Sequence, residues 1–278
     1  MKLLAMLIFL LAVDAITVAQ FESGTVIVVG YSQNKIIIAA DSRSVDEGKV
    51  PTDNDCKITA LSNKLFFSAS GRTHDVTLGM LGWDATDQAR QALAAVSTHA
   101  PIGTFTQAMA IEWAQLIGQN ISHNIRQQEY DSLIPRHVYI AGIFAGLGPN
   151  VDLQGTHIRV DRGESSRPIE RHMIYTTPVE LPLSDTMGYL SLSGQTEILN
   201  EFIGTGSARA KIERAITLKE SKRWPIFDSD ARMVIRLTEL VIKYWNHPEL
   251  AHGPVDAVEI DKGGSVRWIQ RKPNCTDQ

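Results

Sequence analysis

The chain has 278 residues, of which 44% are hydrophobic and 21% are charged, and its formal net charge is −4. This composition is ordinary for a globular protein, and it favours one large domain over two. The small negative charge gives no electrostatic reason to expect nucleic acid as a partner.

The N-terminus has the three-part layout of a secretory signal peptide. Lys2 is followed by eleven apolar residues, 3–13, and the small residues 17–19 (TVA) offer a cleavage site. As a helix, this apolar run would rise only about 16 Å, which is too short for a bilayer core of about 30 Å. A buried N-terminal strand or helix is the alternative. We expect residues 1–19 to be removed and the protein to be secreted or periplasmic, with no membrane attachment afterwards.

Two strand pairs are predicted next along the chain. Residues 25–31 and 35–40 are apolar on both faces and are joined by a polar turn. Residues 57–61 and 64–70 form a second hairpin, which ends at Gly71. Strands that are apolar on both sides are typically covered by a further layer on each side.

Two helices are predicted after these hairpins. The first carries alanines and other apolar residues at the helical period from about residue 85 to 96. The second begins at Thr104, whose spacing to Gln107 is that of a capping box, and runs to about Ile125. The apolar face of the second helix is expected to consist of Phe105, Ala108, Met109, Trp113, Leu116 and Ile117.

Strand signals return at residues 137–146 and 156–160. Residues 161–197 are rich in glycine, serine, proline and charge, which predicts surface loops and irregular strands.

The last third of the chain is predicted to hold two helices and a hairpin. The helices run from about Ser207 and from residue 228 or 229 to Trp245, and the third hairpin covers 255–270. This order of elements predicts an α+β fold, a four-layer αββα sandwich of two antiparallel sheets with helices on both outer sides.

A candidate site lies at the ends of the first two hairpins. Thr25 opens the first strand, Asp41 follows the second strand 16 residues later, and Lys57 opens the third after another 16. A carboxylate beside an apolar run is costly unless a cation meets it, so we expect Lys57 to lie near Asp41. Antiparallel hairpins bring alternate strand ends to one edge, so Thr25 is expected there too.

Residues 24–71 resemble the opening of a catalytic proteasome β subunit, a threonine-type N-terminal nucleophile (Ntn) hydrolase. In that family a threonine preceded by glycine begins the mature chain. An Ala-Ala-Asp-Ser-Arg sequence, a lysine and a glycine follow at the positions that Asp41, Lys57 and Gly71 occupy here. The resemblance implies an Ntn-hydrolase fold with Thr25 as the nucleophile.

The resemblance also implies a role for each of these residues. The α-amino group of Thr25 would be the base for its own hydroxyl, since a hydroxyl alone is a weak nucleophile. Lys57 would stabilise charge on the attacking oxygen, and Asp41 would hold the lysine ammonium in place. The backbone N–H of Gly71 would be the oxyanion donor.

Two further parts of the family pattern fall later in the chain. The family motif Gly-Ser-Gly-Ser ahead of a helix is matched by residues 204–207, so Thr205 would supply the serine hydroxyl and Ser207 would assist it. The family's aspartate before the last strand pair aligns near Pro248, with Glu249 as the candidate replacement. Arg43 is interpreted as a structural residue near the site.

The implied organisation is a signal peptide at 1–19, a short propeptide at 20–24 and a hydrolase domain at 25–278. The expected function is an exported, self-activating hydrolase that cleaves peptide or other amide bonds without a cofactor or metal. A non-catalytic proteasome-like subunit or binding protein, and a small-molecule amidase, stay open as alternatives. A homo-oligomeric ring also stays open.

Other conspicuous residues are given structural interpretations. Cys56 and Cys275 could form one bridge or remain free thiols, and Cys56 is expected to be a small buried residue. His247 and His252 do not form a HExxH motif, which favours loop histidines over zinc ligands. Residues 204–206 (GTG) do not extend to a GxGxxG pattern, so a nucleotide is not expected.

Overall fold

A computed structural model gives the fold of the chain. It describes residues 25–43, 52–71, 73–75, 83–96, 105–127, 137–147, 151–161, 171–178, 188–191, 230–245 and 251–275. The expected signal peptide, propeptide, 204–207 motif and candidate Glu249 lie outside the described residues.

Two five-stranded antiparallel sheets form the centre of the molecule. The first sheet has the order β10-β1-β2-β11-β12, with strands at Gly188–Ser191, Ile27–Tyr31, Lys35–Ala40, Asp256–Asp261 and Val266–Gln270. The second sheet has the order β3-β4-β7-β8-β9, with strands at Ile58–Ser62, Leu65–Gly71, His137–Leu147, Val151–Asp161 and Arg171–Pro178. A small separate pair joins β5 (His74–Asp75) to β6 (Trp83–Asp84).

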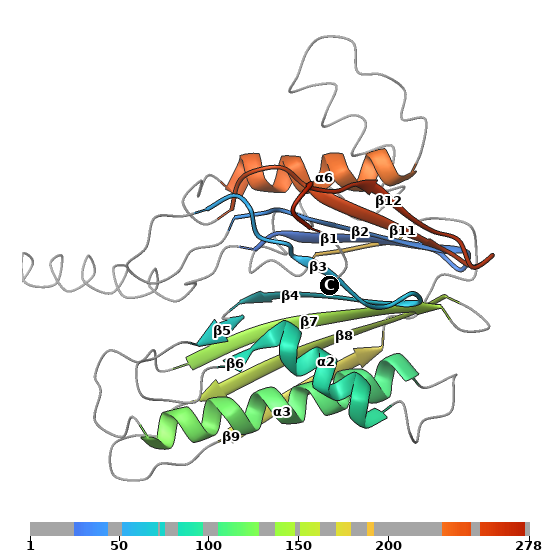
Figure 1. The fold of residues 1–278 in the computed structure, drawn as a ribbon. Helices are drawn as coiled ribbons and strands as arrows, with labels where there is room; N and C mark the ends of the chain where they lie inside the picture. Colours follow the sequence, from blue (N-terminus) through green and yellow to red (C-terminus); the bar gives the residue numbers. More distant parts are fainter. Residues whose placement is uncertain are drawn as a thin grey trace, which may run out of the picture.

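Helices cover the outer faces of the two sheets (Figure 1). Helix α6 (Asp230–Trp245) lies on the first sheet, and helices α2 (Ala85–Val96) and α3 (Phe105–Gln127) lie on the second. The predicted α+β sandwich of two antiparallel sheets is therefore confirmed. None of the helices within the described ranges is both long enough and apolar enough to cross a membrane.

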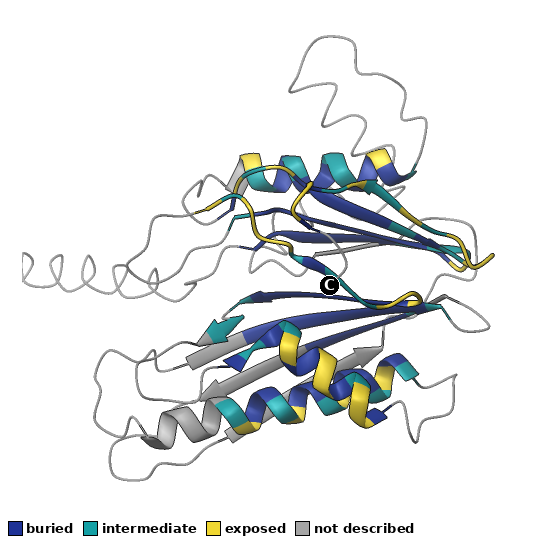
Figure 2. Ribbon diagram, in the orientation of Figure 1, coloured by how far each residue is buried: buried dark blue, intermediate teal, exposed yellow. Residues whose placement is uncertain are grey.

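The strands of the first hairpin are buried on both faces, as their sequence predicted. In β2, Ile36 and Ile38 pack between the sheets, whereas Ile37 and Ala39 pack under α6. Figure 2 shows this burial along both central sheets. Fully buried strands of this kind form a rigid support, so the chain segments at their ends start from fixed positions.

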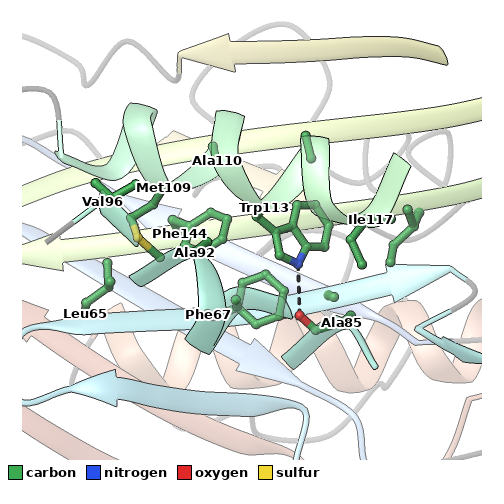
Figure 3. Close-up of a cluster of buried hydrophobic side chains, with 14 of the residues drawn as sticks. Leu65, Phe67, Ala85, Ala92, Val96, Met109, Ala110, Trp113, Ile117 and Phe144 are labelled. Atoms are coloured by element: carbon green, nitrogen blue, oxygen red, sulfur yellow. Dashed lines mark hydrogen bonds between the residues drawn. The ribbon is translucent and has the colours of Figure 1, made fainter. Parts of the chain in front are cut away.

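The outer core of the second sheet is built around Trp113 of α3. Its indole contacts the rings of Phe67 and Phe144, and its Nε1–H donates a 2.9 Å hydrogen bond to the carbonyl of Ala85 (Figure 3). Met109 and Ile117 are fully buried on the same helix, as the periodicity predicted. The indole thus joins α3 to the start of α2 and to the sheet.

The segment predicted as loops and irregular strands contains two regular strands, β9 and β10. Strand β9 pairs with β8 without a register shift, and β10 pairs with β1. Each lies at the edge of its sheet and needs hydrogen bonds on one side only. Such a strand can form with the short apolar runs that this stretch offers, which is why its sequence signal is weak.

Gly142 in β7 is where the indole of Trp113 rests on the sheet. A Cβ there would lie 2.6 Å from Cη2 and 2.7 Å from Cζ3 of Trp113, and 3.2 Å from Phe67. We expect Gly142→Ala to lower the free energy of unfolding by about 1–3 kcal/mol, because the packed core must shift. Urea denaturation measures this value.

The control for this variant is Gly146→Ala on the same face of β7. Its Cβ would meet Thr106 Cγ2 at 3.1 Å and its next neighbour at 3.5 Å, so the loss should be smaller. Equal losses at the two positions would contradict the role given to Trp113.

Candidate active site

Thr25 and Asp41 lie together at one end of the first sheet. Thr25 is buried and directly precedes Val26, which faces Asp41 across the β1–β2 pair. The Asp41 N–H donates to the Val26 carbonyl at 3.1 Å, and the Val26 N–H donates to Asp41 Oδ1 at 3.0 Å. The side chain of Asp41 therefore extends the strand pairing and fixes the backbone beside Thr25.

The second oxygen of Asp41 holds two other parts of the chain. Its Oδ2 accepts hydrogen bonds from the N–H of Arg43 at 3.2 Å and from the N–H of His252 at 3.3 Å. Gly253 permits this approach, since its φ of +84° suits glycine and a Cβ there would lie 2.4 Å from Ser42 Oγ. The carboxyl group thus joins β1, the end of β2 and the loop before β11.

Burial dominates the titration of Asp41. It raises the pKa of this carboxyl from 3.8 to about 7, although the charge of Lys57 and the three backbone N–H groups act to lower the pKa. A carboxyl with this pKa changes charge near neutral pH, as groups at catalytic sites frequently do.

Lys57 lies near Asp41, but its direct ion pair is with another carboxylate. Its Nζ lies 2.9 Å from Asp55 Oδ2, and the lysine side chain is only 9% exposed. Between Asp41 and Lys57 no ion pair is formed, so Lys57 lies near Asp41 as expected, but Asp41 acts on the lysine ammonium by charge and does not hold it directly. Backbone N–H groups contact both Asp41 oxygens, whereas Lys57 Nζ lies against Asp55.

Gly71 lies at the same end of the β3–β4 hairpin as Lys57. The pairing of Ile58 with Ser68 places the start of β3 beside the end of β4, and Ser68 Oγ–H donates to the Lys57 carbonyl at 2.6 Å. Gly71 ends β4 with a φ of +94°, a left-handed conformation that strongly favours glycine. The structure therefore gives a backbone reason for glycine at this position.

The two sheet ends are tied to each other beside these residues. The Asp55 N–H donates to the Ser42 carbonyl at 3.0 Å, which joins the segment before β3 to the chain just after Asp41. Thr25, Asp41, Lys57 and Gly71 thus come from four strand ends that meet on one side of the sandwich.

An ion-pair network next to the site was missing from the sequence interpretation. Arg43 forms a bidentate pair with Asp53, with Nε at 2.6 Å from Oδ1 and Nη2 at 2.9 Å from Oδ2. His252 Nδ1 lies 3.2 Å from Asp53 Oδ2. The hydrogen bond from Arg43 is the main reason that the pKa of Asp53 is lowered. Arg43 was interpreted as a structural residue, and its ion pair with Asp53 fits that interpretation. No sequence pattern pointed to Asp53 as its partner.

Cys56 and Cys275 form a disulfide, which resolves the choice that the sequence left open. Cys56 is exposed, so the expectation of a buried residue was wrong; its partner Cys275 is the buried member. The bridge attaches the end of the chain to the residue next to Lys57.

The other predicted residues of the site are not placed. Thr205, Ser207 and Glu249 lie outside the described residues. His252 is a half-exposed loop residue. In the described parts of the chain, no three or more His, Cys, Asp or Glu side chains gather where they could hold a metal ion.

Comparison with known proteins does not assign the chain to a family. No protein-family model matches the chain, and no curated protein matches it at a significant level.

The raised pKa of Asp41 should make stability depend on pH. Between about pH 4 and pH 7 the folded protein keeps a proton on Asp41 that the unfolded chain releases, so this group's contribution to stability falls as pH rises. Asp41→Asn cannot titrate. We therefore expect wild type to lose stability relative to this variant over that window, as measured by urea denaturation at a series of pH values.

Asp53→Asn is the matched control for this titration. The pKa of Asp53 is lowered, so the stability that its ionisation contributes is lost only below the ordinary carboxyl range. The difference between wild type and Asp53→Asn should therefore stay constant from pH 4 to pH 7. A constant difference for Asp41→Asn as well would refute the assignment.

Proposed function

We propose that the protein is an exported, self-activating threonine-type Ntn hydrolase that cleaves peptide or other amide bonds through Thr25. In this proposal the two sheets and their covering helices are the four-layer αββα sandwich of that class. No cofactor takes part.

One observation carries the proposal. Thr25, Asp41, Lys57 and Gly71 are separated in sequence by 16, 16 and 14 residues, and they come from four strand ends that meet on one side of the sandwich. A strand-opening threonine, a buried carboxyl near a lysine or a terminal glycine would each be unremarkable alone. Their combination supplies a nucleophile, a nearby positive charge and a glycine N–H, which are the groups that acyl transfer requires.

The chemistry follows from these groups once Thr25 is N-terminal. The Thr25 hydroxyl attacks the substrate carbonyl and passes its proton to its own α-amino group, whose ordinary pKa is about 7.7–8.0. The charge of Lys57 stabilises the developing oxygen charge, and the Gly71 N–H is the donor proposed for the oxyanion. The amine leaves with the proton, and water then hydrolyses the Thr25 ester.

Asp41 supports this reaction by position and by charge. Its Oδ1 accepts a hydrogen bond from the backbone N–H of Val26, the residue after the nucleophile. This bond fixes the Val26 backbone without needing a side chain of Val26. Its ionised form would place a negative charge near Lys57. Because the pKa of Asp41 is about 7, activity should rise with pH through neutrality.

Maturation would use the same nucleophile. Signal cleavage after residue 19 would leave the five residues 20–24 in front of Thr25, and these block its amino group. The Thr25 hydroxyl could still attack the Gly24 carbonyl, where the missing side chain removes one obstruction. Hydrolysis of the resulting ester would release residues 20–24 and free the amine.

The disulfide supports the exported location. Disulfides persist in oxidising compartments and are rare in the cytosol, and the bridge between Cys56 and Cys275 matches the leader-like N-terminus in this respect.

Self-cleavage can be tested with two substitutions of the nucleophile. Wild type should mature to a chain that begins at Thr25, whereas Thr25→Ala should keep residues 20–24 and be inactive. Thr25→Ser retains a hydroxyl and should mature at least in part. Intact-mass spectrometry of the three proteins, purified after export, measures the outcome. A wild-type chain that begins at Gln20 would instead favour a non-catalytic proteasome-like protein.

The second test concerns the lysine. Lys57→Ala should lower kcat on an amide substrate by roughly two to four orders of magnitude, because the charge beside the attacking oxygen is lost. Lys64→Ala is the matched control, since Lys64 is an exposed lysine in the turn at the other end of the same hairpin. A folded Lys57→Ala protein with near-normal activity would rule out the proposed role.

A further inference from the structure

The last described residues of the chain form a strap across the site side of the molecule. Residues 271–275, which we call the C-terminal strap, follow β12 and are anchored by Asp256, the first residue of β11. Lys272 Nζ lies 2.7 Å from Asp256 Oδ2, and the Lys272 N–H donates to Oδ1 at 2.9 Å. Both side chains are buried, with 7% and 2% exposure, so removal of one partner would leave the other charge buried without its counter-ion.

The strap makes three contacts with residues 53–57, which we call the Lys57 segment. Lys272 Nζ donates to the Asp55 carbonyl at 2.5 Å, and Asn274 Nδ2 donates to the Asn54 carbonyl at 2.9 Å. The third contact is the Cys56–Cys275 disulfide. Three consecutive residues directly before Lys57 are therefore each held by the strap.

The opposite side of the same segment is held by the chain after Asp41. Arg43 pairs with Asp53, and the Ser42 carbonyl accepts from the Asp55 N–H. The segment thus lies between the end of β2 and the strap. Without the strap, residues 53–56 would keep the attachments on the β2 side, through Ser42 and Arg43. They could then shift away from their position beside the strap.

We propose that the C-terminal strap positions Lys57 relative to Asp41, so that Lys272, Asn274 and Cys275 are positioning residues for the reaction of Thr25. This inference rests on the proposed function for its catalytic part. None of the three residues is assigned contact with substrate; each acts through the backbone that carries Lys57. A small displacement of a catalytic group can lower a rate by about 100-fold.

The position of Lys57 can be measured without any activity. Two strap variants, Cys56→Ser/Cys275→Ser and Lys272→Met, are compared with wild type by amide hydrogen exchange. Peptides that cover residues 53–58 should exchange at least 10-fold faster in both variants, whereas β7 peptides should not change. Lys262→Met is the matched control, because Lys262 is an exposed lysine in the turn of the same β11–β12 hairpin.

The same variants test the catalytic part. We expect kcat to fall roughly 10- to 100-fold while KM stays within about threefold, since the reacting groups move and the substrate contacts do not. Lys272→Arg keeps a donor to Asp256 and should recover most of the rate. Lys262→Met should match wild type.

The pH profile separates positioning from simple loss of folded protein. Among the described residues, Lys57 acts on the Asp41 carboxyl by charge, and the nearby side chains of Arg43 and His252 each pair with Asp53. If Lys57 moves away, the acid limb of kcat should shift to higher pH. A smaller folded fraction would lower kcat and leave the limb in place.

Each outcome decides a part of the inference. Unchanged exchange at residues 53–58 in both strap variants would overturn it, whatever the activity. Faster exchange with wild-type kcat and pH profile would overturn the catalytic part and reduce the strap to a structural feature. An inactive wild-type protein with correct maturation would overturn the proposed function, while the exchange comparison would still decide whether the strap holds Lys57.

Discussion

The carboxyl group of Asp41 is the interaction on which this side of the molecule depends. It accepts the backbone N–H groups of Val26, just before β1, of Arg43, shortly after β2, and of His252, in the loop before β11 and more than 200 residues away in the chain. A buried carboxyl is costly to ionise, and the raised pKa of Asp41 expresses that cost. One side chain therefore both organises the backbone and places a titratable group next to Thr25.

The double burial of the central strands makes this arrangement possible. Because β1 and β2 are packed under α6 on one face and against the second sheet on the other, their ends cannot move independently. The second sheet is held in the same way by the Trp113 cluster on its outer face. The residues proposed for chemistry lie at strand ends and not in long loops, so the two cores determine their positions.

Lys57 differs from the other site residues in how it is held. It directly precedes β3, an edge strand. Residues 53–57 are held by ion pairs and hydrogen bonds, whereas β1 and β2 are held by the hydrophobic core on both faces. The disulfide and the Lys272–Asp256 pair supply the missing rigidity from the other end of the chain. An oxidising compartment would suit a protein that secures an important residue in this way.

The sequence by itself determined most of the helices and strands, the double burial of the first hairpin and the even spacing of Thr25, Asp41 and Lys57, since periodicity and spacing are local properties. Gly71 entered as a candidate through the resemblance to proteasome β subunits. Strand β9 gave a weak signal because an edge strand needs few apolar residues. Only the tertiary structure decided that backbone N–H groups occupy both oxygens of Asp41, that Asp55 pairs with Lys57 and that Cys275 bonds to Cys56. These contacts depend on how chain folding brings the groups together. No local sequence pattern encodes which groups will pair.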